Sequence, residues 1–207
     1  MQTVLTTPSR LAKRAQYDET TIHAILDEAL FCTVSYAING QPMAIPTAFA
    51  RQGNRLYIHG SVGSHFIRAI ETGGRVCITV MLADGLVLAK SAFSHSVNYR
   101  SVVIFAQAEK VEDAAEKMQA LALLTDHLIP GRWDDLRPTT QSELRKTTVL
   151  AFSLAEASAK TRTGGPNDEP EDIDLPTWAG IIPLQTVRLT PVAADSSLDV
   201  PIPQYLL

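Results

Sequence analysis

The strongest constraint on the fold is a succession of short strand-type segments separated by tight-turn signals. Runs rich in β-branched, aromatic and small apolar residues cover 31–37, 42–51, 55–59, 75–82, 86–92 and 98–111. Turn signals separate several of them, at Asn39-Gly40, Gln52-Gly53-Asn54 and Asp84-Gly85, and residues of this kind form tight hairpin turns. Closely spaced short strands favour an antiparallel barrel or sandwich, and the interspersed helices favour the barrel. The pattern therefore predicts a mainly β fold with flanking helices.

Helical spacing of apolar residues predicts helices over about 20–30, 66–70, 112–128 and 142–146. Asp18 or Thr20 is the expected N-cap of the first helix, because both side chains accept hydrogen bonds from free backbone N–H groups. A further strand is expected over 148–154. The last one spans 178–189, where Pro183 indicates an edge position or a bulge.

A length of 207 residues with 45% apolar side chains suits one domain, 1–207, with an N-terminal arm over 1–18. The stretch 159–176 is acidic, polar and proline-rich, so it is expected to be a surface excursion with little burial of its own. The tail from Thr190 onward is expected to be irregular.

Several functional classes are excluded on composition and motifs. A formal charge of −4 gives no reason to expect nucleic acid or an anionic membrane. No apolar run approaches the roughly 20 residues of a membrane-spanning helix, and no secretory signal is apparent, so a cytoplasmic protein is expected. Dinucleotide, phosphate-loop, zinc-protease and serine-hydrolase motifs are missing. Cys32 and Cys77 lie in apolar runs typical of core packing, and no metal site is expected.

The segment His59 to His65 (HGSVGSH) is the first candidate binding site. Its small residues let backbone N–H groups approach an anion, its hydroxyls add donors, and the helix that follows directs its positive end toward the same place. This chemistry suits a phosphate group. The alternative is an ordinary turn between a strand and a helix.

The second candidate is the polar cluster Ser94 to Ser101 (SHSVNYRS). Arginines outnumber lysines by 12 to 6 in the whole chain, and the guanidinium group suits bidentate phosphate contacts. Arg100 could hold the phosphate, with Ser101 or Tyr99 adding a hydrogen bond. The alternative is a surface arginine paired with aspartate or glutamate.

A third candidate group combines Lys160, Arg162 and Trp178. Trp178 could cover an aromatic ring, or it could belong to the core or to a dimer surface, where tryptophan is common.

At these clusters the sequence resembles the pyridoxamine 5′-phosphate oxidase-related family, in the branch that includes nitroimidazole-resistance reductases and other flavin-nucleotide-binding proteins. The resemblance extends over nearly the whole chain, in order. It is carried by residues 14–18, Pro46-Thr47, Leu56 to Ser61, Ser94 to Val103, Gly131 to Asp134, Lys160 to Gly164 and Trp178 to Gly180.

The resemblance implies a six-stranded antiparallel split β-barrel and a homodimer with FMN at its interface. By position, Pro46 and Thr47 would lie along the flavin, and His59, Gly60 and Ser61 would follow its ribityl chain and ring edge. Ser64 and His65 would bind the phosphate. Arg100 and Ser101 would complete that cradle, while Lys160, Arg162 and Trp178 would come from the partner subunit.

The chain departs from pyridoxamine-phosphate oxidases proper at two places. Ser64-His65 replaces an arginine-lysine pair, and the last strand holds only Arg188 to match their substrate-binding residues. Pyridoxamine-phosphate oxidation is therefore not expected.

The leading hypothesis is an FMN-dependent oxidoreductase of flavin-reductase or nitroreductase type, with NADH or NADPH as a possible electron donor and a small-molecule substrate. His59 or His95 would be the histidine near the flavin ring, and neither the substrate nor a catalytic residue is assigned. The alternative is a non-catalytic flavin carrier or a haem-binding protein on the same barrel. Its iron ligand would be His59, His65 or His95.

Overall fold

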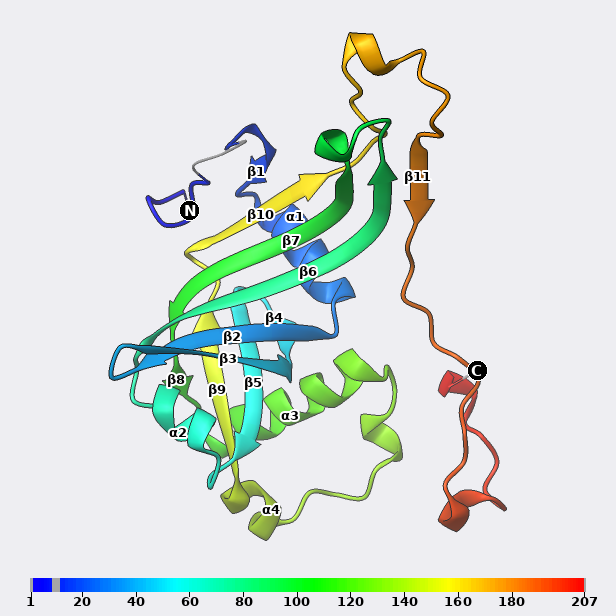
Figure 1. The fold of residues 1–207 in the computed structure, drawn as a ribbon. Coiled ribbons are helices and arrows are strands. Elements are labelled where there is room, and N and C mark those ends of the chain that lie inside the picture. The colour runs from blue at the N-terminus through cyan, green and yellow to red at the C-terminus, as the bar shows by residue number, and fades with distance from the viewer. Residues whose placement is uncertain (1, 9–11, 207) are drawn as a thin grey trace.

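A computed structural model describes residues 2–8 and 12–206, and within them the strands form two antiparallel sheets (Figure 1). The larger sheet follows the order β1-β10-β7-β6-β2-β3, with β11 paired to β6. Its strands are β1 (Ala15–Gln16), β2 (Phe31–Ile38), β3 (Gln41–Ala48), β6 (Arg75–Leu88), β7 (Ser96–Gln107), β10 (Ala157–Arg162) and β11 (Gly180–Pro183).

The smaller sheet follows the order β4-β5-β9-β8. Its strands are β4 (Ala50–Gln52), β5 (Arg55–Ser61), β8 (Glu109–Lys110) and β9 (Thr147–Ser153). The chain passes from the larger to the smaller sheet at buried Phe49 and again at buried Ala108. Both sheets contribute to one core, in which Val34, Ile78 and Ile104 pack with Ile58 and Phe152.

Four α-helices flank the sheets: α1 (Glu19–Glu28), α2 (His65–Ile70), α3 (Ala114–Leu128) and α4 (Gln141–Lys146). Helix α1 begins at the predicted cap Asp18, whose side chain accepts a hydrogen bond from the Thr21 N–H, and it buries Ile22 and Leu26 in the shared core. Helix α3 covers the other face of the smaller sheet, where Tyr57, Val149, Ala151 and Ala120 form a second apolar cluster. Short 3-10 helices lie at Ala12–Arg14, Ala92–Ser94, Trp133–Asp135, Pro170–Asp172, Asp195–Ser197 and Gln204–Leu206.

The mainly β, antiparallel character predicted from the sequence is confirmed. The strands of the described residues form two sheets, of seven and four strands, in place of the expected set of six. The run 42–51 is two strands, because Phe49 turns inward between β3 and β4. The runs 75–82 and 86–92 belong mostly to one strand, β6, which passes Asp84-Gly85 through an irregularity in its pairing with β7 instead of a turn.

The polar excursion begins later than predicted. Residues Ala157–Arg162 form β10, which pairs with β7 and β1, so the loop starts only after Arg162. Asp168 accepts a hydrogen bond from the Lys90 N–H at 2.7 Å, and the Lys90 ammonium donates to the Leu175 carbonyl. The loop then returns to β11, a strand that pairs only with the far end of β6, as expected of an edge position.

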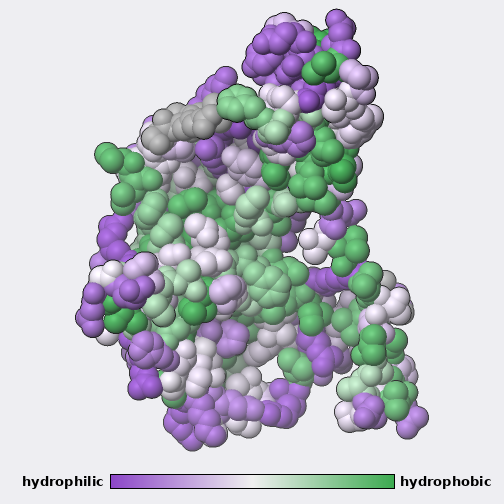
Figure 2. Space-filling view, in the orientation of Figure 1, coloured by the Kyte–Doolittle hydropathy of each residue, from purple (hydrophilic) through white to green (hydrophobic). Residues whose placement is uncertain are grey.

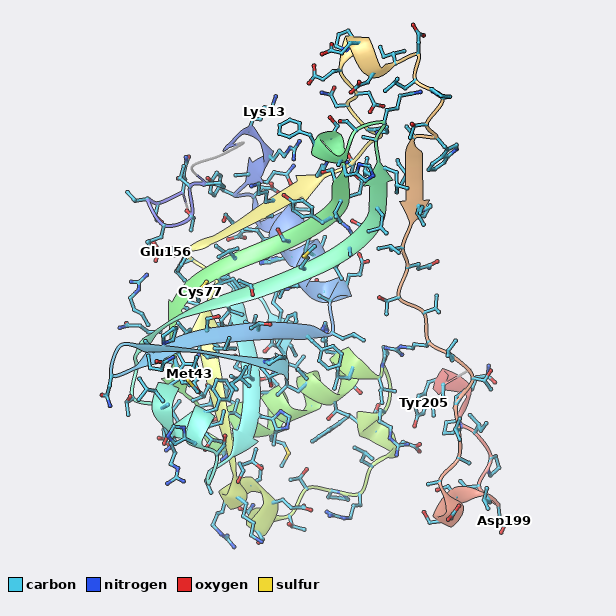
Figure 3. The ribbon with its side chains drawn as sticks, viewed as in Figure 1. Lys13, Met43, Cys77, Glu156, Asp199 and Tyr205 are labelled. Carbon is cyan, nitrogen blue, oxygen red and sulfur yellow. The ribbon has the colours of Figure 1, made fainter. Side chains whose placement is uncertain are left out.

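The chain after β11 forms an arm, residues 184–206, that runs beside the end of α3 (Figure 1). Arg188 donates to the Leu128 carbonyl, and the Tyr205 hydroxyl donates to Asp135 at 2.6 Å while accepting from Arg132 at 2.9 Å (Figure 3). The arm leaves many aliphatic side chains in solvent. They include Val187, Leu189, Val192, Leu198, Val200 and Ile202.

Helices of the described residues are all too short or too polar to cross a lipid bilayer. Both cysteines are free thiols; Cys32 is buried, which raises its pKa to about 12, and Cys77 is half-buried.

Candidate functional site

The predicted phosphate loop connects β5 to α2. Ser64 is the N-cap of α2, and its hydroxyl accepts a hydrogen bond from the Ile67 N–H. The Ser61 hydroxyl accepts from the Gly63 N–H at 3.1 Å, and Arg68 donates to the Gly63 carbonyl at 2.9 Å. Gly60 packs against Ile67 so closely that a Cβ there would lie 2.6 Å from its Cγ1. The loop is thus tightly held against α2, with Arg68 as a nearby cation.

His59 precedes this loop and points to the other side of β5, into a cleft under α3. The cleft has a volume of about 250 Å³ and is mostly apolar. Its walls are Ala48, Leu121, Leu124, Thr125, Leu128, Trp133, Thr139 and Thr147. The imidazole remains accessible to solvent there, yet desolvation lowers its pKa below the usual value, which favours the neutral form.

Pro46 and Thr47 lie near the end of β3, opposite Thr33 and Cys32 of β2. The next residue, Ala48, lines the His59 cleft. The end of β3 therefore lies beside the His59 end of β5.

Arg100 is held by two carboxylates of its own chain. Its guanidinium donates to Asp84 at 2.7 and 3.0 Å and to Glu28 at 2.8 Å and through a second, shorter contact. These hydrogen bonds raise the pKa of Arg100 and hold the pKa values of Glu28 and Asp84 below their usual range. Arg100 is thus paired as in the alternative interpretation of the sequence.

Arg100 and Ser101 cannot face one pocket within a chain. Successive residues of a strand point to opposite faces, and Arg100 reaches toward α1 on the core side, while the Ser101 hydroxyl donates to the Lys160 carbonyl of the neighbouring strand. Arg100 pairs with Leu82 of β6 and Thr161 of β10 and contacts the end of α1, whereas the Ser64 loop connects β5 of the smaller sheet to α2, which Figure 1 shows well away from this part of β7. One chain therefore does not bring Arg100 to the Ser64 loop.

Lys160 and Arg162 lie on β10 opposite Ser101 and Tyr99 of β7. Arg162 is already engaged, since it donates to the Asn98 side chain and to the carbonyls of Gly164 and Gly165. These residues share the upper part of the larger sheet with the excursion, away from α2 (Figure 1).

Trp178 lies against Gly180, where a Cβ would come within 2.7 Å of the indole ring. The ring is nevertheless 64% exposed. Only glycine allows this close approach, and the free face of the indole is available to another group.

The outer face of the larger sheet carries few charges at its centre. Cys77, Thr79 and Met81 of β6 and Val103 and Phe105 of β7 alternate with buried core residues and are all at least partly exposed. The centre of the surface in Figure 2, over β2, β6 and β7, is accordingly pale or green, and purple gathers at its margins. An uncharged sheet face of this kind is typical of a protein interface.

The predicted residues thus fall into two groups. Pro46, Thr47, His59, Gly60, Ser61, Ser64 and His65 lie near the β5–α2 loop, and Arg100, Ser101, Lys160, Arg162 and Trp178 lie toward the excursion. The apolar wall that α3 and Trp133 give to the His59 cleft was not predicted. Within the described ranges, no three or more His, Cys, Asp or Glu side chains are placed to hold a bare metal ion.

Comparison with known families matches residues 18–161 to the family model described as pyridoxamine 5′-phosphate oxidase. The chain belongs to this family. The resemblance noted from the sequence is therefore confirmed. Comparison with curated proteins gives no match.

Two solved structures resemble this chain over almost its whole length. The flavocytochrome Anf3 from Azotobacter vinelandii is 41% identical, with a TM-score of 0.92 over 99% of this chain and 95% of its own. The FAD and haem binding protein from Mycobacterium smegmatis is 36% identical, with a TM-score of 0.88 over 93% of this chain and 95% of its own.

A protein from Bacteroides thetaiotaomicron, assigned to 5-nitroimidazole antibiotic resistance, shares the fold. It is 24% identical, with a TM-score of 0.60 over 70% of this chain and 85% of its own. The arm and excursion after residue 161 lie beyond the family model, whereas the two haem-associated structures match the chain almost throughout.

Proposed function

We propose that this protein binds both a flavin and haem, as a homodimer, and transfers electrons between a reduced donor and an acceptor. The observation that carries the proposal is the full-length match, at 41% identity, to a structure described as a flavocytochrome. A second full-length relative is described as binding FAD and haem.

The flavin site rests on the two groups of residues described above. The loop from Gly60 to Ser64 offers hydroxyls, backbone N–H groups and the Arg68 cation for a phosphate. Lys160, Arg162 and Trp178 lie too far along the sheet to join this loop in the same chain, so we assign them to the flavin of the partner subunit. The sequence predicted FMN; the relative that binds FAD favours the larger nucleotide here.

The exposed apolar surface supports the proposed dimer. The central outer face of the larger sheet is uncharged, and the arm 184–206 holds aliphatic side chains in solvent. Burying both removes apolar surface from water at about 25 cal/mol per Å². A second copy of the chain supplies a matching surface by two-fold symmetry.

The residues present also fit haem. Haem brings its own four nitrogen ligands and needs from the protein an apolar cleft and one or two axial side chains, most often histidine. The His59 cleft offers that combination, and no multi-residue metal cluster competes with it in the described part of the chain. A flavin accepts electron pairs and haem iron passes electrons singly, so together they suit an oxidoreductase.

The test is cofactor identification on protein purified from cells supplied with a haem precursor. Acid extraction and chromatography distinguish FAD from FMN, and a pyridine haemochromogen assay counts haem per chain. Anaerobic addition of NADH or NADPH then shows whether the bound flavin is reduced and whether the haem follows.

We expect stoichiometric flavin, a Soret band, and reduction of both groups. Flavin without haem, even after haem titration, would leave the predicted FMN-type oxidoreductase. Both cofactors without reduction by any donor would indicate a carrier, and the lack of both would contradict the proposal.

A further inference from the structure

We propose that His59 is the axial ligand of the haem iron and that the cleft between β5 and the C-terminal half of α3 receives the macrocycle. This inference rests on the proposed function, because it assigns a place and a ligand to the haem. It selects His59 from the three iron ligands that the sequence offered, His59, His65 and His95, in place of the flavin contact that the family resemblance implied.

The cleft places apolar side chains around a single imidazole. Leu121, Leu124 and Leu128 of α3 and the indole of Trp133 face the same space as the His59 imidazole. An apolar macrocycle packs well against such side chains, and an imidazole is the only iron-binding group among the residues that line the cleft.

The His59 imidazole is not engaged by other side chains of the described residues. Across the part of the chain that the structure describes, no residue forms a hydrogen bond with the His59 ring, which leaves both nitrogens available. Of the other four histidines, His65 also forms no side-chain hydrogen bond within the described residues but does not line the cleft, and the remaining three are engaged. His23 contacts the Asn54 side chain at 3.1 Å, His95 donates to the Ser91 carbonyl at 2.8 Å, and His127 donates to the Ala29 carbonyl at 2.7 Å.

Further space lies beyond the cleft, toward the C-terminal arm. Leu128 also lines a larger cavity of about 760 Å³ between the end of α3 and the C-terminal arm. Leu189, Pro191 and Leu206 make this cavity largely apolar, and Arg188 is its cation. Haem combines an apolar ring with two carboxylates, so Arg188 is placed to pair with a propionate.

His95 is the strongest competitor. Its hydrogen bond to a backbone carbonyl leaves the other ring nitrogen free, an arrangement common among metal-binding histidines. However, His95 is exposed and lines neither cavity of this chain. It therefore lacks the apolar walls that would hold a macrocycle beside it.

The experiment compares His59→Ala, His95→Ala and the matched control His23→Ala, all purified as full-length protein and titrated with haemin. We expect His59→Ala to lose the Soret band of the wild type and to bind haem at least about a hundredfold more weakly, since even changes to residues behind a metal ligand cost ten- to a hundredfold. The other two variants should keep the band. Added imidazole should restore a Soret band to His59→Gly.

Circular dichroism and melting temperature report whether each variant is folded. If His59→Ala does not fold, His59→Met keeps a side chain of similar bulk and should bind haem with a shifted Soret band and altered electron paramagnetic resonance.

A wild-type spectrum in folded His59→Ala or in His59→Met would overturn the assignment, as would loss of haem in His95→Ala alone. Loss of flavin with retained haem in His59→Ala would return His59 to the flavin. A wild-type protein that binds no haem at all would overturn the proposed function, and this assignment with it.

Discussion

Replacing Arg100 by methionine removes a guanidinium that joins three parts of the fold. Arg100 donates to Glu28 at the end of α1 and to Asp84 at the irregular point of β6. Asp84 and Arg100 are 31% and 32% exposed, so their charge-assisted pair should contribute about 1–2 kcal/mol. The Glu28 pair is more exposed, at 54%, and should add about 0–1 kcal/mol.

We therefore expect Arg100→Met to lower the free energy of unfolding by about 1–3 kcal/mol at pH 7, measured by urea denaturation. For a chain of this size, each kcal/mol lowers the melting temperature by about 2–4 °C. Arg145→Met is the matched control. Arg145 is exposed in the last turn of α4, so its loss should change stability by about 0.5 kcal/mol or less.

The loss should depend on pH with a defined sign. Arg100 depresses the pKa values of Glu28 and Asp84 in the folded state. The stabilisation is therefore complete above the unfolded-state values, about pH 4–4.5, and disappears as pH falls through the lower folded-state values. The difference between wild type and Arg100→Met should shrink as pH falls below about 4.5. Equal stability at pH 7, together with weaker flavin binding, would refute this reasoning and place the guanidinium on a phosphate.

Three further predictions follow from packing. Gly60→Ala should lower the free energy of unfolding by about 1–3 kcal/mol, because the added Cβ would lie 2.6 Å from the Ile67 side chain. Gly63→Ala is the control, since its added Cβ would have its nearest neighbour at 3.6 Å and should cause no comparable overpacking. Equal melting temperatures of the two variants in calorimetry would contradict this packing. Phe49→Ala should cost about 3–5 kcal/mol in urea denaturation, since the ring is fully buried where the chain changes sheets, and a loss below about 1 kcal/mol would contradict that role. Met81→Glu should convert the proposed dimer to monomers in sedimentation velocity, because it places a charge on the outer sheet face, and an intact dimer would place the interface elsewhere.

The sequence predicts turns and helix caps correctly where residues adjacent in the chain determine the structure. Asn39 and Gly40 both adopt positive φ, at 50° and 80°, as a tight hairpin of this type requires, and β2 and β3 pair across them. Asp18 caps α1 as expected. In these cases a few adjacent residues carry the whole physical cause.

The sequence-based predictions are wrong where contacts between segments distant in the chain determine the structure. The sequence Asp84-Gly85 is typical of a turn, but β6 continues through it because β7 pairs with one side of the strand and β11 with the other. Gly85 also lets the neighbouring strand approach closely, since a Cβ on residue 85 would lie only 3.1 Å from the Ile182 carbonyl oxygen. Residues 157–162 are strand because β7 and β1 flank them, which their composition does not reveal.

The residue types of the candidate site were predictable from the sequence. Which of these residues lie together in one chain was less predictable. The alternation of β strands already implies that Arg100 and Ser101 point to opposite faces, and this signal was available in the sequence. The cleft around His59 was not, because it arises from α3 and Trp133, more than sixty residues away along the chain. The packing of α3 and Trp133 against β5 forms this cleft, and no local motif around His59 indicates it.

Native mass spectrometry of the purified, haem-supplied protein tests the central claim most directly, because it weighs chain number and bound groups together. We expect a dimer whose mass includes one flavin and one haem for each chain. A monomer, or a dimer with no flavin or no haem after both have been supplied, would contradict it.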